Sequence, residues 1–319
     1  MRRSGLFAAG ILAVIAVGGC ATGGSAPAGP AAVLAPQTKA EPPVPLPNQE
    51  GSLKFAVFGD FRTASRQQYQ LAGQMEKLHR TFLFELVILT GDNLYGSERP
   101  QDFVNKFEIP YKPLLDRKVK FYASLGNHDD RNQRYYKHFD MEEKQYYSFK
   151  APKQAVRFFA LETTYPEPEQ IAWLEAELKR SGEAWKIMFF HHPLYSSGGR
   201  HGSDYRLREA LEPLLGQHDV SVVFAGHDHF YERIKPQKGI AHFVVGSAGK
   251  LAPGDLDDRS PLTAKGFDTD YAFLVAEVVG DQMYFNAITR SGQIVDAGII
   301  LRRQPAAAPS GAASETRAR

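Results

Sequence analysis

Five short clusters carry side chains of the types that bind metal ions in proteins. They are Gly-Asp at 59–60, Gly-Asp-Asn-Leu-Tyr at 91–95, Gly-Asn-His-Asp at 126–129, His-His-Pro at 191–193 and Gly-His-Asp-His at 226–229. Each follows an apolar run typical of a buried β-strand. One cluster alone is a weak signal, because Asp and Asn also favour turns. Five in succession predict two metal ions held at one edge of a sheet.

The elements that must position these clusters alternate between strands and helices. Strands are expected at 53–58, 86–90, 119–124, 156–162, 185–190, 220–224, 241–245, 271–279, 282–289 and 294–301. Helices are expected at 67–80, 101–115, 169–181 and 205–215, the second interrupted by Pro110 and Pro113. The pattern is that of an α/β domain. Open sheets bind ligands where the carboxyl ends of their strands form a crevice, so all five clusters are expected in one place.

Composition narrows the class of protein. The chain has 319 residues, of which 43% are hydrophobic and 23% charged, enough for one large globular core. It carries 38 Lys and Arg against 36 Asp and Glu; loss of Arg2 and Arg3 with an export signal would leave 36 against 36. No long basic run is present, which argues against nucleic-acid binding.

The amino terminus has the pattern of an export signal. Arg2 and Arg3 precede a short apolar stretch at 6–17, which is followed by Val17-Gly18-Gly19-Cys20. This resembles a bacterial lipobox, which implies acylation of Cys20 and a membrane-anchored lipoprotein facing the periplasm. Ala21 favours the outer membrane by the usual rule for such proteins. The alternative is an ordinary cleaved signal with an incidental cysteine.

The expected domain organisation follows from these patterns. A lipoprotein signal peptide at 1–20 precedes a disordered tether rich in Pro, Ala and Gly at 21–51. A catalytic domain is expected at 52–303 and a disordered tail at 304–319. Cys20 is the only cysteine, so no disulfide is expected once it is modified. The protein is expected to be monomeric.

The five clusters resemble those of the calcineurin-like metallophosphoesterase superfamily. Within it, they are most similar to the low-molecular-weight purple acid phosphatases. The resemblance runs from about Phe55 to Gly249. It implies a four-layer α/β/β/α sandwich with two mixed sheets and a binuclear metal centre at the sheet edge.

The resemblance also implies which residues bind each ion. Asp60, Asp92, Tyr95 and His229 would hold the first metal, and Asp92, Asn127, His191 and His227 the second. Asp92 would bridge the two. A shared carboxylate is physically sensible, because it offsets the repulsion between two neighbouring cations.

One departure from the superfamily pattern selects the purple acid phosphatases. Most members carry Gly-Asp-x-His in the first cluster, whereas this chain has Arg62, whose guanidinium stays protonated and cannot bind a metal. Tyr95, three residues after Asp92, replaces that ligand. A phenol has an ordinary pKa of about 10, so binding it as phenolate favours a hard trivalent ion. Fe(III) is therefore expected beside Tyr95, with divalent Fe, Zn or Mn in the second site.

The expected chemistry is hydrolysis of a small phosphomonoester by metal-bound hydroxide. Such a centre keeps positive charge after the ligand charges are subtracted, so it attracts phosphate. His128 is the family's substrate-contacting histidine, and Asp129 is placed to orient it. His201 lies ten residues after His191 and is expected to protonate the leaving oxygen. His192 is expected to contact substrate.

Two other functions remain open at this point. A phosphodiesterase or nucleotidase on the same scaffold would need the same metals, because the motifs do not select the ester. A metal- or phosphate-binding lipoprotein without turnover is the alternative from a different class. The presence of both His128 and His201 argues against it.

Overall fold

The computed structural model describes residues 44–61, 63–182 and 185–304. Cys20, the tether up to residue 43, Arg62 and the tail from residue 305 lie outside the described residues. None of the helices in the described ranges combines the length and apolar character needed to cross a bilayer.

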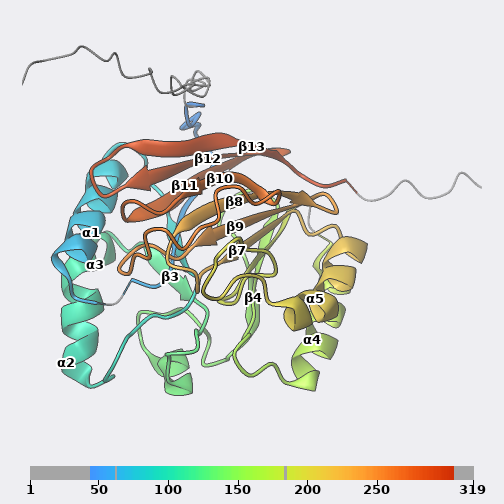
Figure 1. Cartoon of the computed structure of the whole chain (residues 1–319), viewed down its shortest axis with the longest axis horizontal. Coiled ribbons are helices and arrows are strands. Elements are labelled where there is room, and N and C mark those ends of the chain that lie inside the picture. Colours follow the sequence, from blue (N-terminus) through green and yellow to red (C-terminus); the bar gives the residue numbers. More distant parts are fainter. Residues whose placement is uncertain (1–43, 62, 183–184, 305–319) are drawn as a thin grey trace, which may run out of the picture. The chain divides into compact units, whose positions relative to one another are not determined.

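Two mixed sheets form the centre of the molecule (Figure 1). In the six-stranded sheet, β1, β2 and β3 run parallel and β11 to β13 are antiparallel. Its strands, in spatial order, are β13 (Ile294–Leu301), β12 (Gln282–Thr289), β11 (Ala272–Val279), β1 (Leu53–Phe58), β2 (Leu86–Leu89) and β3 (Lys120–Ala123).

The seven-stranded sheet has a parallel centre formed by β5, β6, β7 and β9. Strands β4, β8 and β10 join it in antiparallel pairs. In spatial order it comprises β10 (Thr263–Phe267), β8 (Tyr231–Gln237), β9 (Ile240–Val245), β7 (Val222–Ala225), β6 (Trp185–Phe189), β5 (Val156–Ala160) and β4 (Tyr147–Lys150).

Helices cover the outer faces of both sheets (Figure 1). On the six-stranded side lie α1 (Arg66–His79), α2 (Pro100–Phe103) and α3 (Ile109–Asp116), and on the other side α4 (Pro168–Ser181) and α5 (Tyr205–Gln217). Two short helices complete the set, a π-helical segment at Val104–Glu108 and a 3-10 segment at Arg131–Tyr135. The architecture is the α/β/β/α sandwich that the sequence predicted.

Aromatic side chains join the two sheets. The Phe55 ring of β1 lies 5.3 Å from the Phe158 ring of β5 and 6.2 Å from the Phe224 ring of β7. Phe243 of β9 packs against Phe285 of β12 at 5.1 Å. Rings at these spacings bury large apolar areas in preferred edge-on geometries. The sheets are therefore packed face to face, so the carboxyl ends of β1, β2, β6 and β7 share one side of the molecule.

The helical region at 101–115 was expected to be interrupted at Pro110 and Pro113, but in the structure it continues through Pro110. In the π-helical turn, the Ile109 N–H donates to the Val104 carbonyl. The carbonyls of the next turn are therefore free to accept from side chains. Tyr69 Oη donates to the Asn105 carbonyl at 2.8 Å, and Gln68 Nε2 donates to the Lys106 carbonyl at 2.6 Å. The missing N–H of Pro110 therefore leaves no carbonyl unsatisfied.

Three short strands were not expected from the sequence. Strand β4 has only four residues, β8 includes Pro236 and several charges, and β10 lies at an edge. Strand β4 does alternate apolar and polar residues, but over only four positions, whereas β8 and β10 lack this alternation.

Candidate metal centre

Strand ends from both sheets deliver the five clusters to one place. Asp60, Asp92 and Asn127 follow β1, β2 and β3, while His191 and His227 follow β6 and β7. The loops are linked by main-chain bonds: Gly59 N–H donates to the Val245 carbonyl at 2.8 Å, and Gly249 N–H to the Asp60 carbonyl at 3.0 Å. The carboxyl edges of the two sheets therefore form a single rim.

Three of these residues have an unusual backbone conformation. Asp60, Asp92 and His227 have φ values of 56°, 52° and 72°. Positive φ is uncommon for residues other than Gly, although Asn, Asp and His tolerate it best, and it tends to persist where function requires it. Each of the three residues lies in the loop that directly follows its strand.

One group of potential metal ligands consists of Tyr95, Asp60 and His229. The Tyr95 hydroxyl lies 3.2 Å from Asp60 Oδ1 and 3.2 Å from His229 Nε2. His229 Nε2 lies 3.6 Å from the same Asp60 oxygen. Asp60 Oδ2 also accepts from the main-chain N–H of His227 at 3.0 Å, which fixes the carboxylate. This is the expected first-metal group without its bridging ligand.

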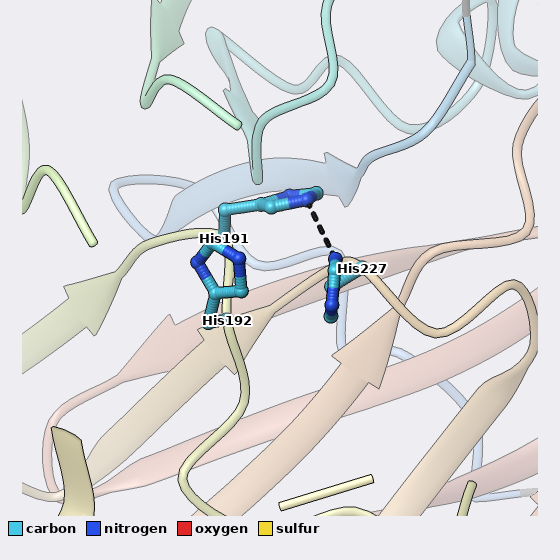
Figure 2. Close-up of side chains that lie close together, drawn as sticks. All are labelled: His191, His192 and His227. Carbon is cyan, nitrogen blue, oxygen red and sulfur yellow. Dashed lines mark hydrogen bonds between the residues drawn. The ribbon is translucent and has the colours of Figure 1, made fainter. Parts of the chain in front are cut away.

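Asp92, Asn127, His191 and His227 form a second group. His191 Nε2 lies 3.0 Å from Asn127 Oδ1, 3.1 Å from His227 Nδ1 and 3.4 Å from Asp92 Oδ1. Figure 2 shows His191 and His227 facing each other from separate loops, with His192 beside them. The structure thus brings together the residues expected to bind the second metal, and their assignment to that metal stays a prediction.

The protonation of His191 indicates what this second group would bind. Its Nδ1 lies 3.0 Å from the Thr90 carbonyl oxygen, which can only accept, so Nδ1 carries the proton. In the neutral ring, Nε2 then has a lone pair that faces the oxygens of Asn127 and Asp92. A ring lone pair and side-chain oxygens that converge in this way suit a cation, and a carbonyl that orients a ligating imidazole is usual in metal sites.

Asp92 lies between the two groups. Ligand atoms of Asp60, Asp92 and His191 all fall within 4.8 Å of one another, and all three side chains are buried. Asp92 Oδ1 is held by the main-chain N–H of His128 at 3.1 Å. A buried carboxylate in this position fits the expected bridging role.

Burial and mutual repulsion keep the histidines neutral. Burial, with the neighbouring His191, lowers the pKa of His227 to about 2, and burial with Lys250 lowers the pKa of His229 to about 4. The pKa of His192 also falls to about 4, chiefly through burial. Neutral imidazoles retain the lone pairs that metal binding needs.

His192 and His201 extend the cluster beyond the expected ligands. His192 Nδ1 lies 3.0 Å from the Thr163 hydroxyl, and its ring lies 4.4 Å from the His227 ring. His192 also forms a possible cation-binding group with His191 and His227. The exposed ring of His201 lies 4.2 Å from the His227 ring. Both lie where they can contact a bound ester.

His128 lies beside Tyr95, their ring centres 4.8 Å apart. The carboxylate of Asp129, which was expected to orient His128, accepts five hydrogen bonds from other residues. They come from the main-chain N–H groups of Asn93, Leu94 and Gly126 and the side-chain amides of Asn93 and Gln133. These bonds hold the loop that leads to Tyr95, so Asp129 also positions this loop.

Lys250 was missed in the sequence. Its ammonium lies 3.4 Å from the centre of the Tyr95 ring, and its main-chain N–H donates to the Asp60 carbonyl at 3.0 Å. The signal was present: Gly249-Lys250 closely follows a strand, as do the five clusters. It was overlooked because lysine is not a common metal ligand.

The chain matches the family model described as calcineurin-like phosphoesterase over residues 53–231. Over 245 residues it is 29% identical to purple acid phosphatase 17 of Arabidopsis thaliana, covering 65% of this chain and 72% of the relative. Human tartrate-resistant acid phosphatase type 5 is 24% identical over 249 residues, covering 65% and 76%.

Solved structures share the fold. Purple acid phosphatase PPD1 from yellow lupin seeds superposes with a TM-score of 0.65 at 20% identity, covering 81% of this chain and 55% of that one. A Plasmodium protein described as GAP50, the anchor in the inner membrane complex, reaches a TM-score of 0.70 at 20% identity, covering 79% and 90%. These structural similarities show a shared fold.

Proposed function

This chain belongs to the calcineurin-like phosphoesterase family, and we propose that within that family it hydrolyses phosphomonoesters at a binuclear Fe(III)–M(II) centre. The family match and the purple acid phosphatase relatives make it a metal-dependent phosphoric ester hydrolase. The identity of the metals, the preference for monoesters and the mechanism are our proposal.

The position of the Tyr95 hydroxyl carries this proposal. It lies 3.2 Å from both Asp60 Oδ1 and His229 Nε2, within a group of metal-ligand types. Binding a phenolate below its ordinary pKa of about 10 requires a strong Lewis acid, and a trivalent ion meets this better than zinc. The second group offers only nitrogen and oxygen ligands, which suit divalent Fe, Zn or Mn.

The bound metals would supply Lewis acidity toward the phosphate oxygens and a hydroxide nucleophile from water. The protein's own residues then bind and orient the ester. His128 and His201 flank the ligands from opposite loops, so each can donate to a phosphate or leaving-group oxygen. Attack on phosphorus breaks the ester bond, and His201 is the proposed proton donor to the departing oxygen.

Metal analysis combined with an ester panel tests this function. We expect about one Fe(III) and one divalent ion per chain. We also expect faster hydrolysis of a para-nitrophenyl monoester than of the corresponding bis ester. Tyr95→Phe should remove the visible colour that arises from phenolate-to-Fe(III) charge transfer. A preference for the bis ester would instead indicate the phosphodiesterase function. An active, iron-free and colourless protein would reject the assignment of Tyr95.

We further propose that Cys20 is acylated and anchors the enzyme, as a monomer, to the periplasmic face of a membrane, the outer one being favoured. Cys20 lies outside the described residues, so the proposal rests on the pattern of residues 1–20. In the intact chain, Cys20→Ala should move the protein from the membrane to the soluble fraction. Unchanged membrane association would contradict the anchor.

A further inference from the structure

A pocket of about 510 Å³ opens directly beside the metal-ligand cluster. His192, His201 and His227 belong to its lining. The lining also includes Arg200 and, from the first turn of α5, Tyr205 and Arg206. An ester bound at the metal centre, with His201 beside its leaving oxygen, would therefore extend its leaving group into this pocket.

The lining of the pocket carries a net positive charge. Arg200 and Arg206 are both exposed, and neither guanidinium has an ion-pair partner among the described residues. Asp204 is the acidic residue of the pocket lining. Its Oδ1 accepts from the Leu207 N–H at 2.9 Å, so it caps α5. Two unpaired guanidinium groups thus outweigh one carboxylate that is already engaged.

The segment that carries these groups is fixed on both sides. Ser196 Oγ donates to Asp228 Oδ2 at 2.5 Å, and Ser197 N–H donates to Glu232 Oε2 at 2.9 Å. Farther along, Gly199 N–H donates to the Asp255 carbonyl and Asp204 N–H to the Pro193 carbonyl, each at 2.8 Å. The backbone that presents the arginines is therefore ordered before a ligand arrives, which lowers the entropic cost of binding.

We propose that this pocket is a leaving-group subsite that favours leaving groups carrying a second phosphoryl group. The inference rests on the proposed phosphoesterase function and adds a substrate class to it. Water attacks the phosphorus held at the metal centre, the bond to the leaving oxygen breaks, and that oxygen takes up a proton. The products are inorganic phosphate and an anionic leaving group held by Arg200 and Arg206, whose planar guanidinium groups match phosphoryl oxygens.

Comparing two kinds of substrate in matched variants tests the subsite. Pyrophosphate and adenosine diphosphate have anionic leaving groups, whereas para-nitrophenyl phosphate releases an aryl group without a second phosphoryl. For Arg200→Gln and Arg206→Gln, the ratio of kcat/KM for a diphosphate to kcat/KM for the aryl ester should fall by about fivefold each, as expected for exposed charge pairs. The double variant should combine both losses. Arg134→Gln, which changes a half-buried arginine that stacks on Tyr135, should leave the ratio unchanged.

Each outcome separates this inference from the proposed function. If the wild type hydrolyses the aryl ester but the double variant keeps the wild-type ratio, the subsite is wrong and the phosphoesterase function stands. If the wild type hydrolyses neither kind of substrate, the proposed function fails. Calorimetry on the metal-loaded protein then decides the subsite: pyrophosphate must bind more tightly than inorganic phosphate, and the double variant must lose that preference.

Discussion

The Lys250 ammonium lies 3.4 Å from the centre of the Tyr95 ring, so a cation faces the π-system of the proposed iron ligand. A cation over an aromatic face is attracted by the ring's electrons, and the attraction grows when that ring carries negative charge. Lys250 also lies on the loop bonded to the Asp60 carbonyl. It therefore adds positive charge to the centre without being a ligand.

Lys250→Met should shift the absorption band of the iron-loaded protein to longer wavelength. The ammonium stabilises the filled orbitals of the Tyr95 phenolate, so its removal narrows the energy gap for charge transfer to Fe(III). Phosphate binding should also weaken by about fivefold, since one positive charge is lost. Visible spectroscopy and phosphate titration measure both effects. Lys250→Arg keeps the charge and should stay near the wild type; an identical spectrum in the Met variant would contradict this role.

Gly126→Ala should abolish metal binding at the second site. A Cβ at this position would lie 2.2 Å from Asp92 Oδ1 and 2.4 Å from the Asp92 main-chain nitrogen, so the proposed bridging carboxylate must move. Metal content per chain and activity are the measurements, with a loss of at least tenfold in activity expected. The matched control is Gly73→Ala in α1, where nothing lies within 4 Å of the added Cβ. That variant should keep full metal content and gain roughly 0.5–1 kcal/mol of stability.

Asp129→Ala should lower occupancy of the Tyr95 site, although Asp129 is not a ligand. The change leaves the N–H groups of Asn93 and Leu94 without their acceptor, which costs about 2–4 kcal/mol in the free energy of unfolding. Iron content and chemical denaturation measure the two effects. Asp116→Ala removes an exposed aspartate that pairs with Lys112 and should change both by little. Full iron content in the Asp129 variant would show that the loop holds without this residue.

His201→Gln should slow hydrolysis of alkyl phosphates much more than that of para-nitrophenyl phosphate. An alkoxide must be protonated as it leaves, whereas para-nitrophenolate is stable without a proton. A general acid contributes about 10²–10⁴-fold when protonation limits the rate. The measurement is kcat for an alkyl phosphate and for para-nitrophenyl phosphate, in the variant and in the wild type. Equal losses on both esters would indicate that His201 binds phosphate rather than donating a proton.

His242→Phe should reduce the acid sensitivity of the metal-free protein. Burial lowers the pKa of His242 to about 3 from an ordinary value of 6.5, so between these values only the unfolded chain takes up this proton. The wild type therefore loses stability as the pH falls from 6.5 toward 3. Between pH 7 and pH 5 the histidine accounts for about 2 kcal/mol of that loss. Denaturation at both pH values measures it, and parallel losses in variant and wild type would contradict the assignment.

Much of the site could be predicted because its residues follow predictable strands. Asp60, Asp92, Asn127, His191 and His227 each come directly after a buried apolar run, and the carboxyl ends of parallel strands meet at one edge. The role of Asp129 could not be predicted in this way. It depends on hydrogen bonds to Asn93 and Leu94, which lie more than thirty residues away in the sequence.

The sequence by itself determined the alternation of elements, the types of metal-binding residue and their order along the chain, because periodicity and side-chain chemistry are local properties. Only the tertiary structure decided that Lys250 faces Tyr95, and that Arg200 and Arg206 share a pocket with His201. Those relationships arise where loops of two separate sheets meet. They depend on how the sheets pack through residues such as Phe55 and Phe158, which no local pattern encodes.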